Sequence, residues 1–509
     1  MQEKIFCYAK FNVDALLALA EKLRGRPCTC DVSKPPKAGS LNWVIFVSFD
    51  DGIDWVFRSP RTGPSTILTD ETASKMLVSE ASTLKYLRAH CSIPVPEVYS
   101  YSGSKDNDVG VPYILQSKAS GRALSDYDWA DCSREPSGYK LPWPLLPLSD
   151  HDRQNIMRQL GAIMSRLSEI RFEQIGSIFE DRHGNFSIGE CLSPSLLWQW
   201  RDSIEEAIDR GPFSEEGQYL NSLISAFTSH AKELYLTPHT FFAPIPDSLD
   251  YPTWDSYRAA ARRWNDFVAI GNKIESSKNR LSYCIAGQFL HNMIPHLSST
   301  ANGGFTLSHP DLHSGNIFVD EDLNITCIID WGSATSGPIT ELLTTPGLAG
   351  SASPPSRSQI TAFRSCFNLG VPKIDPDVWK KADRMWYFSR LVRLLSKQDY
   401  NLFKTLYELV YEIEDEGAVG SVDYARLFHE QAQQEGNKQL FAKLREDDAS
   451  EEEVKEREEA AFRLEKKKKS NSLAVARKLT LMSEMNPGFV ADKRLWRWIG
   501  DALGQVDSV

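Results

Sequence analysis

The residues best suited to chemistry lie between positions 307 and 334, in the stretch LSHPDLHSGNIFVDEDLNITCIIDWGSA. Two short apolar runs, NIFVD and ITCIIDW, are separated by the turn residues EDLN, which predicts a β-hairpin. Asn316 comes directly before the first strand and Asp330 ends the second, so both side chains should gather at one end of the hairpin. Asp311 lies in the loop that enters it. Three oxygen-bearing side chains are thus expected to converge where Mg²⁺ and a polyphosphate could bind, because Mg²⁺ prefers one or two carboxylates together with phosphate oxygens and water.

The order of these residues also matches the chemistry of phosphoryl transfer. His309 is followed after one residue by Asp311, and Asn316 comes five residues later. An apolar strand then ends in Asp330. In the phosphoryl-transfer template the first carboxylate accepts the proton of the attacking hydroxyl, while the amide and the second carboxylate hold magnesium. Asp311 alone would more often stabilise a turn, but the full spacing favours the catalytic interpretation.

Together, HPDLHSGN and IIDW resemble the aminoglycoside phosphotransferase and choline kinase-like family, and in overall arrangement its fungal branch, which includes the group named for altered inheritance of mitochondria. The resemblance extends over residues 35 to 345 and is sharp over residues 308 to 331. It implies a bilobal α+β fold of the protein kinase type, with a β-rich N-terminal lobe and a mainly helical C-terminal lobe. Trp331 after Asp330 suits this small-molecule kinase branch better than the Phe-Gly of protein kinases.

The resemblance also implies roles for the individual residues. Asp311 would be the base, or the orienting carboxylate, for the substrate hydroxyl. Asn316 and Asp330 would hold magnesium. His309 is expected to buttress the loop by hydrogen bonding, and His313 is expected to be exposed.

The nucleotide clamp is implied in the N-terminal region, where the match is weaker. Arg58 stands where such kinases carry the lysine for the α- and β-phosphates, and Glu80 stands where a helix carboxylate pairs with that cation. The place of the loop over the phosphates is taken by a turn that contains Gly39, Ser40 and Asn42. The hinge between the lobes, which would bind adenine through backbone groups, contains Gln116, Ser117 and Lys118.

Two positions depart from the family pattern. Arg58 stays charged and binds phosphate bidentately, but its planar fork does not replace an ammonium, which puts the efficiency of ATP capture in question. Lys75, about one helical turn before Glu80, is the alternative cation. An ordinary surface ion pair is the alternative interpretation of Arg58 and Glu80. Gly332 stands where relatives often carry an acidic residue.

The local sequence predicts the elements that must position these residues. Residues 43–49 and 54–58 are apolar runs joined by an Asp-Asp-Gly turn, which predicts antiparallel strands. Apolar residues at helical spacing in ETASKMLVSEASTLKYLRAHC predict a helix that carries Glu80. The order strand, strand, helix, strand is expected over residues 40 to 120. A mainly helical chain should follow, with its clearest amphipathic helix at 153–170.

Length and composition favour a folded enzyme with more than one lobe. The chain has 509 residues, of which 41% are hydrophobic and 25% are charged, as in an average globular protein. We expect an N-terminal lobe with a leading helix at 1–118, a helical C-terminal lobe at 119–445 and a charged helical extension at 446–509. Aromatic residues crowd an insertion at 194–278, which would form core or shape the acceptor pocket.

Several classes of partner are disfavoured. The net charge of -11 argues against a general binder of nucleic acid or anionic membranes, which needs an excess of Lys and Arg. No apolar run approaches the roughly 20 residues that cross a bilayer. The N-terminus lacks the basic start and cleavage site of a secretory signal, so the expected location is the cytoplasm, with the mitochondrion as the alternative. The nine cysteines are scattered, which indicates free thiols.

The leading hypothesis is an ATP- and Mg²⁺-dependent kinase that phosphorylates a hydroxyl group of a small metabolite. A nucleotide-binding pseudokinase is the first alternative, favoured by Arg58 and Gly332. A protein kinase is disfavoured because the chain lacks a Gly-x-Gly-x-x-Gly loop. The acceptor stays open, because tryptophans suit a quaternary ammonium while a polyamine would suit the acidic residues Asp202, Glu205, Glu206 and Asp209. The oligomeric state stays open as well.

Overall fold

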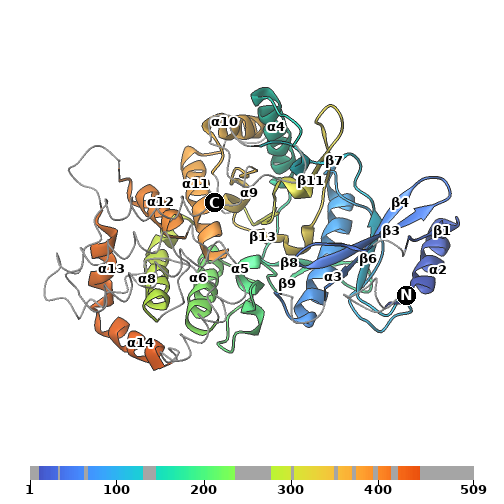
Figure 1. The fold of residues 1–509 in the computed structure, drawn as a ribbon. Coiled ribbons are helices and arrows are strands. Elements are labelled where there is room, and N and C mark those ends of the chain that lie inside the picture. The colour runs from blue at the N-terminus through green and yellow to red at the C-terminus, as the bar shows by residue number, and fades with distance from the viewer. Residues whose placement is uncertain are drawn as a thin grey trace, which may run out of the picture. The chain divides into compact units, whose positions relative to one another are not determined.

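The computed structural model describes residues 11–31, 35–61, 67–129, 145–234, 277–299, 303–348, 354–368, 374–393, 399–413 and 422–446. A sheet dominates the N-terminal part of the chain, and helices dominate the part that follows (Figure 1). This arrangement confirms the predicted α+β class with a β-rich beginning and a helical continuation. Most of the predicted extension at 446–509, and much of the insertion at 194–278, lie outside the described residues.

The N-terminal sheet has the strand order β1-β3-β4-β6-β5, with β2 also paired to β3, and all its pairs are antiparallel. Its strands are β1 (Cys28–Thr29), β2 (Lys37–Ala38), β3 (Asn42–Phe49), β4 (Asp54–Pro60), β5 (Val98–Ser102) and β6 (Tyr113–Ser117). Alternate residues of β3 are buried, as the period of two in a half-buried strand requires. The two predicted strands before the helix and the third expected after it are therefore confirmed as β3, β4 and β6, whereas β1, β2 and β5 were not predicted.

Two helices accompany this sheet. The first, α2 (Val13–Arg24), buries Leu16 and Ala20 against the core around Trp43. The second, α3 (Asp70–His90), is the predicted helix that carries Glu80. Thr69 caps its N-terminus by accepting a hydrogen bond from the N–H of Thr72, and acidic residues occupy its first turn, where the helix dipole favours negative charge.

Short sheets frame the segment that the sequence marked as catalytic. The strands β7 (Arg122–Ala123), β11 (Ile317–Val319) and β12 (Ile325–Ile328) form one, β10 (Thr306–Ser308) and β13 (Thr335–Gly337) another, and β8 (Ser177–Glu180) and β9 (Phe186–Gly189) a third. Gly121 precedes β7 with φ of +86°, and a Cβ at this position would lie 2.2 Å from the carbonyl oxygen of Val319. Only glycine fits where the chain passes this close to β11.

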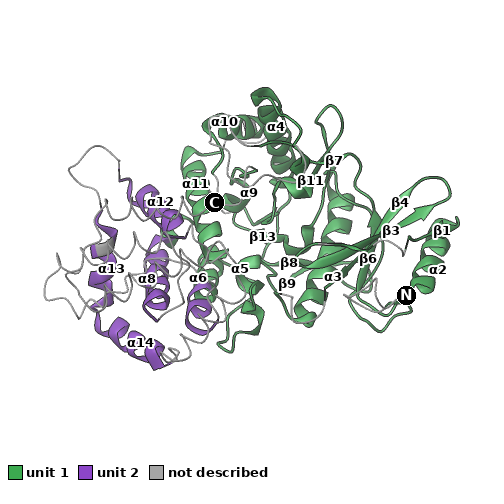
Figure 2. Cartoon of the chain, viewed as in Figure 1, with its two compact units in different colours: residues 1–226, 294–393 green, residues 227–293, 394–509 purple. Residues whose placement is uncertain are grey.

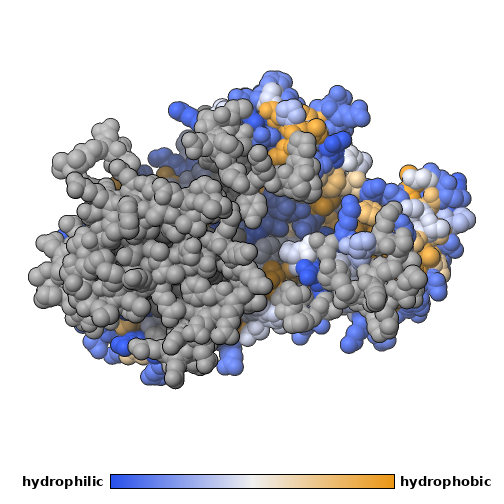
Figure 3. Space-filling view, viewed as in Figure 1, coloured by the Kyte–Doolittle hydropathy of each residue, from blue (hydrophilic) through white to orange (hydrophobic). Residues whose placement is uncertain are grey.

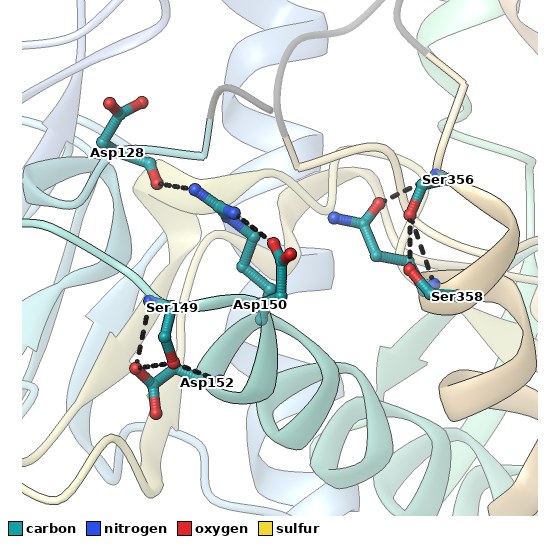
Figure 4. A network of polar contacts seen from close by, with 8 residues as sticks. Asp128, Ser149, Asp150, Asp152, Ser356 and Ser358 are labelled. Atoms are coloured by element: carbon teal, nitrogen blue, oxygen red, sulfur yellow. Dashed lines mark hydrogen bonds and ion pairs between the residues drawn. The ribbon is translucent and has the colours of Figure 1, made fainter. Parts of the chain in front are cut away.

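Two capped helices pack against each other, and the first of them contacts the hairpin through Gln159. Their bounds are α4 (Asp150–Leu167) and α10 (Arg357–Ser365). Each begins with a capping box, built by Ser149 with Asp152 in α4 and by Ser356 with Gln359 in α10. Figure 4 labels Ser149, Asp152 and Ser356 at these two helix starts. A Cβ on Gly161 of α4 would lie 2.1 Å from the carbonyl oxygen of a residue in α10, so the two backbones are in close contact. The predicted helix at 153–170 is thus confirmed with both ends shifted by three residues.

The described residues form two compact units, 1–226 with 294–393 and 227–293 with 394–509 (Figure 2). The predicted catalytic segment lies wholly in the first unit. The core of the second unit includes Phe289, Phe403 and Phe428, whose ring centroids lie 5.3 to 6.0 Å apart. The remaining helices are α5 (Pro194–Leu197), α6 (Glu216–Glu233), α8 (Ser277–Met293), α9 (Ile339–Leu342), α11 (Pro376–Arg393), α12 (Asp399–Tyr411), α13 (Tyr424–Ala432) and α14 (Glu435–Glu446). The lobe boundaries at residues 118 and 445 stay predictions.

The surface of the described residues mixes hydrophilic and hydrophobic side chains on the face shown in Figure 3. Within the described ranges, no helix combines the length and the apolar character needed to cross a membrane. The seven cysteines in these ranges are free thiols, as the sequence predicted for them.

Candidate functional site

The hairpin β11–β12 brings the predicted polar residues together. Ile317 pairs with Ile328 at the end of the hairpin that lies away from its turn. Next to that pair, the N–H of Ile329 donates to the carbonyl oxygen of Asn316 at 2.9 Å. Asn316 and the residue after Ile329, Asp330, therefore lie at the same end of the hairpin. The Nδ2 of Asn316 donates to the main-chain oxygen of Asp311 at 3.0 Å, which ties the entering loop to the same point.

Asp330 has an unusual backbone conformation, with φ of 67° and ψ of 53° in the left-handed region. A non-glycine residue there costs roughly 1–3 kcal/mol, and such strain occurs often at functional sites. The next residue, Trp331, is fully buried, and its Nε1 donates to the carbonyl oxygen of Ile328 at 2.9 Å, which anchors the turn. The side chain of Asp330 stays 35% exposed beside the buried Asn316.

His309 is buried and contacts the end of the hairpin, whereas His313 is exposed to solvent. The Nε2 of His309 lies 2.9 Å from the carbonyl oxygen of Ile329, and its ring packs edge-on against Trp331. Burial lowers the pKa of His309, so the ring is neutral at pH 7 and its Nε2 carries the proton donated to the carbonyl. His313 is 51% exposed, and its Nε2 lies 3.9 Å from Oδ2 of Asp311.

Arg58, on β4, links the N-terminal sheet to this hairpin. Its Nη1 pairs with Glu80 on α3, and its Nη2 donates to Oδ1 of Asp330 at 2.6 Å. With its amide oriented so that both atoms are satisfied, the Asn42 side-chain oxygen accepts from Arg58 Nη2 at 2.8 Å and Nε at 3.3 Å. Arg58 and Glu80 are only 10% and 4% exposed, so the alternative of an ordinary surface ion pair is wrong.

The charges of this cluster depend on one another. Burial alone would lower the pKa of Arg58, but the charges of Glu80 and Asp330 outweigh it and raise that pKa. Burial likewise would raise the pKa of Asp330, and the charge of Arg58 outweighs it, so the pKa of Asp330 is lowered. Burial raises the pKa of Glu80 to about 7 against the pull of Arg58, and the nearby charge of Asp330 adds to that rise. One guanidinium thus serves two carboxylates.

The alternative cation Lys75 and the departure at Gly332 can both be placed in the structure. Lys75 lies 2.9 Å from Glu190 and 3.2 Å from Glu71, and these ion pairs do not include Glu80. A Cβ on Gly332 would lie 3.3 Å from Oε2 of Glu80, so an acidic side chain at this position would face a buried carboxylate. The presence of Gly332 therefore matches the burial of Glu80.

The other predicted nucleotide contacts lie on the β2–β3 turn and at the end of β6 in the N-terminal sheet. The N–H of Gly39 donates to the carbonyl oxygen of Asn42 at 2.8 Å and closes the β2–β3 turn, on which Ser40 is exposed. At the end of β6, Gln116 is buried, and Lys118 Nζ donates to Asp54 at 2.7 Å. The N–H of Ser117, between them, is already used, since it donates to the carbonyl oxygen of Glu97 at 2.8 Å.

Arg393, the last residue of α11, is a site residue that the sequence analysis missed. Its Nη2 donates to Oδ1 of Asp311, and its Nη1 donates to the carbonyl oxygen of Pro310 at 2.8 Å. Its guanidinium lies 4.6 Å from the ring centroid of Trp198. The pair is 82 residues apart in sequence, and no motif around Arg393 marks it.

The residues present fit magnesium better than a softer metal. Within the described ranges, no group of three or more His, Cys, Asp or Glu residues is arranged to hold a metal ion. The side-chain oxygens of Asn316 and Asp330 are hard donors, and Mg²⁺ commonly takes one or two protein ligands and completes its shell with phosphate and water. Oδ2 of Asp330 is the carboxylate oxygen that does not bind Arg58.

Comparison with known proteins agrees with this chemistry. Residues 260–343, which include the hairpin, match the phosphotransferase enzyme family (APH), and the resemblance seen in the sequence is thereby confirmed over these residues. A subtelomeric hrmA-associated cluster protein of Aspergillus fumigatus is 28% identical over 333 residues, 60% of this chain and 58% of that protein. The chain therefore spans less than two thirds of the length of that relative.

Two further similarities are more distant. The mitochondrial protein named altered inheritance of mitochondria protein 9, from Candida dubliniensis, is 26% identical over 183 residues, 34% of this chain and 26% of that protein. The crystal structure of a macrolide 2'-phosphotransferase from Brachybacterium faecium aligns with a TM-score of 0.37 and 14% identity, over 86% of this chain and 99% of that one.

Proposed function

We propose that this chain, whose residues 260–343 match the phosphotransferase enzyme family, is a small-molecule kinase that uses ATP and Mg²⁺ to phosphorylate a hydroxyl group. The observation that carries the proposal is the convergence of Asp311, Asn316 and Asp330 at one end of the hairpin, with the buried cation Arg58 bound to Asp330. A proton acceptor, hard metal ligands and a phosphate-binding cation are the parts that phosphoryl transfer needs.

Asp311 is the proposed group that orients the acceptor hydroxyl and takes its proton. The Nδ2 of Asn316 fixes the main chain of Asp311, and His309, as a neutral donor to Ile329, holds the strand end behind it. Preorganisation of this kind is the main contribution a protein makes to phosphoryl transfer, because the covalent changes occur between the two substrates. A bond forms between the acceptor oxygen and the γ-phosphorus as the bond to the departing ADP oxygen breaks.

Arg58 is the proposed contact for the α- and β-phosphates, with Glu80 as its orienting partner. A guanidinium presents a planar fork of N–H donors that suits phosphate oxygens. Asn316 and Asp330 are the proposed ligands of Mg²⁺, which, when bound, offsets the negative charge on the phosphate oxygens. Two segments complete the proposed nucleotide site. The β2–β3 turn with Gly39, Ser40 and Asn42 covers the phosphates, and the hinge at the end of β6 with Gln116, Ser117 and Lys118 contacts adenine.

A nucleotide-binding pseudokinase is the second candidate, because two ion pairs favour it. Arg58 binds a carboxylate oxygen of Asp330, and Arg393 binds one of Asp311, so both acidic groups are already paired with cations. An active kinase must release at least the oxygens that take part in the reaction. The complete set of Asp311, Asn316 and Asp330 nevertheless favours catalysis, since a scaffold needs none of them for proton transfer.

The experiment that tests the proposal is a screen of metabolite extracts with γ-labelled ATP and Mg²⁺. The wild-type chain should label at least one metabolite, and Asp311→Ala should label none. Asp322→Ala is the matched control, because this exposed carboxylate lies in the turn at the opposite end of the same hairpin. Labelling by Asp311→Ala equal to that of the wild type would reject the proposal. A wild type that labels nothing but melts at a higher temperature with ATP would favour the pseudokinase.

The proposed partner is a small hydroxyl compound, with no nucleic acid and no membrane insertion. The cytoplasm is the proposed location. The mitochondrion is the alternative, because the relative from Candida dubliniensis is named a mitochondrial protein.

A further inference from the structure

The last turn of α11 brings one arginine, Arg393, to the proposed proton acceptor and carries a second arginine, Arg390, near the first. Arg393 hydrogen-bonds Asp311, and the two side chains are 18% and 21% exposed, so the pair is accessible from solvent. Arg390 lies one helical turn earlier on the same face. Burial and the positive charge of Arg393 lower the pKa of Arg390 to about 9, so the two cations are near enough to repel each other.

Both guanidiniums lie on aromatic rings. Arg393 lies 4.6 Å from the ring centroid of Trp198, and Arg390 lies 3.7 Å from that of Trp386. Stacking holds each guanidinium by its face. At the edge, Arg393 donates to Asp311 through Nη2 and to Pro310 through Nη1, and Nη1 of Arg390 donates to the carbonyl oxygen of Trp386 at 3.1 Å. Within the described ranges, Nε of Arg393 and Nε1 of Trp198 are buried donors without a hydrogen-bond partner. The surroundings of Arg393 thus include two buried donors that lack an acceptor within the described ranges.

The acidic residues that the sequence suggested for a polyamine acceptor have other contacts. Asp202 accepts hydrogen bonds from the N–H and the hydroxyl of Thr69 at 2.8 and 2.7 Å, at the start of α3. Asp209 accepts from the N–H of Gly211 at 2.9 Å. Glu205 and Glu206 are exposed. The charge that hydrogen-bonds Asp311 is instead the positive charge of Arg393 at the end of α11.

We propose that Arg393, supported by Arg390, is an acceptor subsite for an anion, so that the hydroxyl compound phosphorylated at this site carries a carboxylate or phosphate group. This inference rests on the function proposed above. Two nearby cations attract such a group and repel an ammonium. A guanidinium binds a carboxylate or phosphate through two parallel hydrogen bonds. When the anion takes the place of Asp311 on Arg393, Oδ1 of Asp311 becomes available to the acceptor hydroxyl, which couples substrate recognition to the release of the proton acceptor.

The test starts from the charge of the acceptor. A metabolite extract is separated by ion exchange into anionic, neutral and cationic fractions, and each fraction is offered with γ-labelled ATP and Mg²⁺. The inference predicts labelled products from the anionic fraction. Arg393→Gln should raise the amount of that fraction needed for half-maximal rate about 30-fold or more, because one partner of a paired charge is lost, with a smaller change in the maximal rate.

Two variants control for charge and folding. Arg393→Lys keeps the positive charge and should recover part of the affinity. Lys381→Ala removes a charge from the same helix about 18 Å away along its axis. It should change neither the amount of the anionic fraction needed for half-maximal rate nor the maximal rate. Labelling confined to products of the cationic or neutral fraction would overturn the inference, as would an equal effect of Lys381→Ala and Arg393→Gln.

Failure of the inference and failure of the proposed function can be separated. Labelling that survives in Asp311→Ala rejects the proposed function. If the wild type labels no fraction, its melting temperature decides the inference, since a ligand that binds the folded state raises it. The anionic fraction must then stabilise the wild type more than Arg393→Gln, and equal shifts in the two proteins overturn the inference.

Discussion

Replacing Arg58 by Met should destabilise the first unit in a pH-dependent manner. The change leaves Glu80 and Asp330 without their shared cation inside a site where Arg58 is 10% exposed and Glu80 4%. Removing one partner of a buried ion pair costs about 3–5 kcal/mol. Arg26→Met is the matched control, because Arg26 pairs with Asp50 while 51% exposed and such a pair contributes under about 1 kcal/mol.

The pH dependence follows from the two carboxylates. The pKa of Glu80 is raised to about 7, so its contribution to stability is present in full below its ordinary value and is lost as the pH rises through 7. The pKa of Asp330 is lowered, so its contribution is present above its ordinary value and is lost only as the pH falls below it. At pH 5.5 Glu80 is protonated and needs no cation, whereas at pH 8 both carboxylates are charged. The loss of unfolding free energy in Arg58→Met should therefore be larger at pH 8 than at pH 5.5.

Urea unfolding followed by tryptophan fluorescence at pH 5.5 and pH 8 measures this difference. Arg58→Lys keeps one positive charge but lacks the guanidinium fork that binds two carboxylates. Its free energy of unfolding should therefore lie between those of the wild type and Arg58→Met. Adding Glu80→Gln to Arg58→Met should recover part of the stability at pH 8. A loss under about 1 kcal/mol in Arg58→Met, or an equal loss at both pH values, would refute the buried three-residue cluster.

Two other substitutions test the framework of the site. Gly121→Ala should lower the free energy of unfolding by at least about 2 kcal/mol, because its Cβ would lie 2.2 Å from the carbonyl oxygen of Val319. Gly110→Ala, also at positive φ but with open space around its Cβ, should lower it by about 1 kcal/mol. Equal losses of unfolding free energy in urea would contradict the close approach at Gly121. Burial raises the pKa of Glu341 to about 7, so the stability linked to its protonation is lost as the pH rises through 7. Glu341→Gln keeps an acceptor for the hydroxyl of Tyr219. This variant should be about 1–2 kcal/mol more stable than the wild type at pH 8 and no more stable than the wild type at pH 5. An equal difference in stability at both pH values would contradict the raised pKa of Glu341.

The sequence was informative where the determinants are local. Asn316 and Asp330 flank two strands joined by a short turn, so the hairpin alone brings them together. The strand with Arg58 and the helix with Glu80 could likewise be predicted from hydrophobic spacing and turn residues, and the resemblance to the phosphotransferase family implied that they pair.

Contacts between distant segments could not be predicted in this way. Arg58 meets Asp330 across 272 positions, and Arg393 meets Asp311 across 82. Neither contact leaves a periodic pattern or a fixed spacing in one sequence, because each depends on how whole elements pack. The acidic residues near position 202 show the same limit, because their composition left a polyamine acceptor open, while Asp202 accepts hydrogen bonds from Thr69 at a helix start.

The most direct test of the central claim is a calorimetric titration with ATP, in the presence of Mg²⁺ and then of a chelator. The wild type and Asp322→Ala should bind ATP at least about tenfold more tightly with Mg²⁺, a difference of about 1.4 kcal/mol. Asp330→Ala should lose this gain while it keeps the binding seen with the chelator. An undiminished gain from Mg²⁺ in Asp330→Ala would contradict the assignment of the hairpin end as the magnesium and nucleotide site.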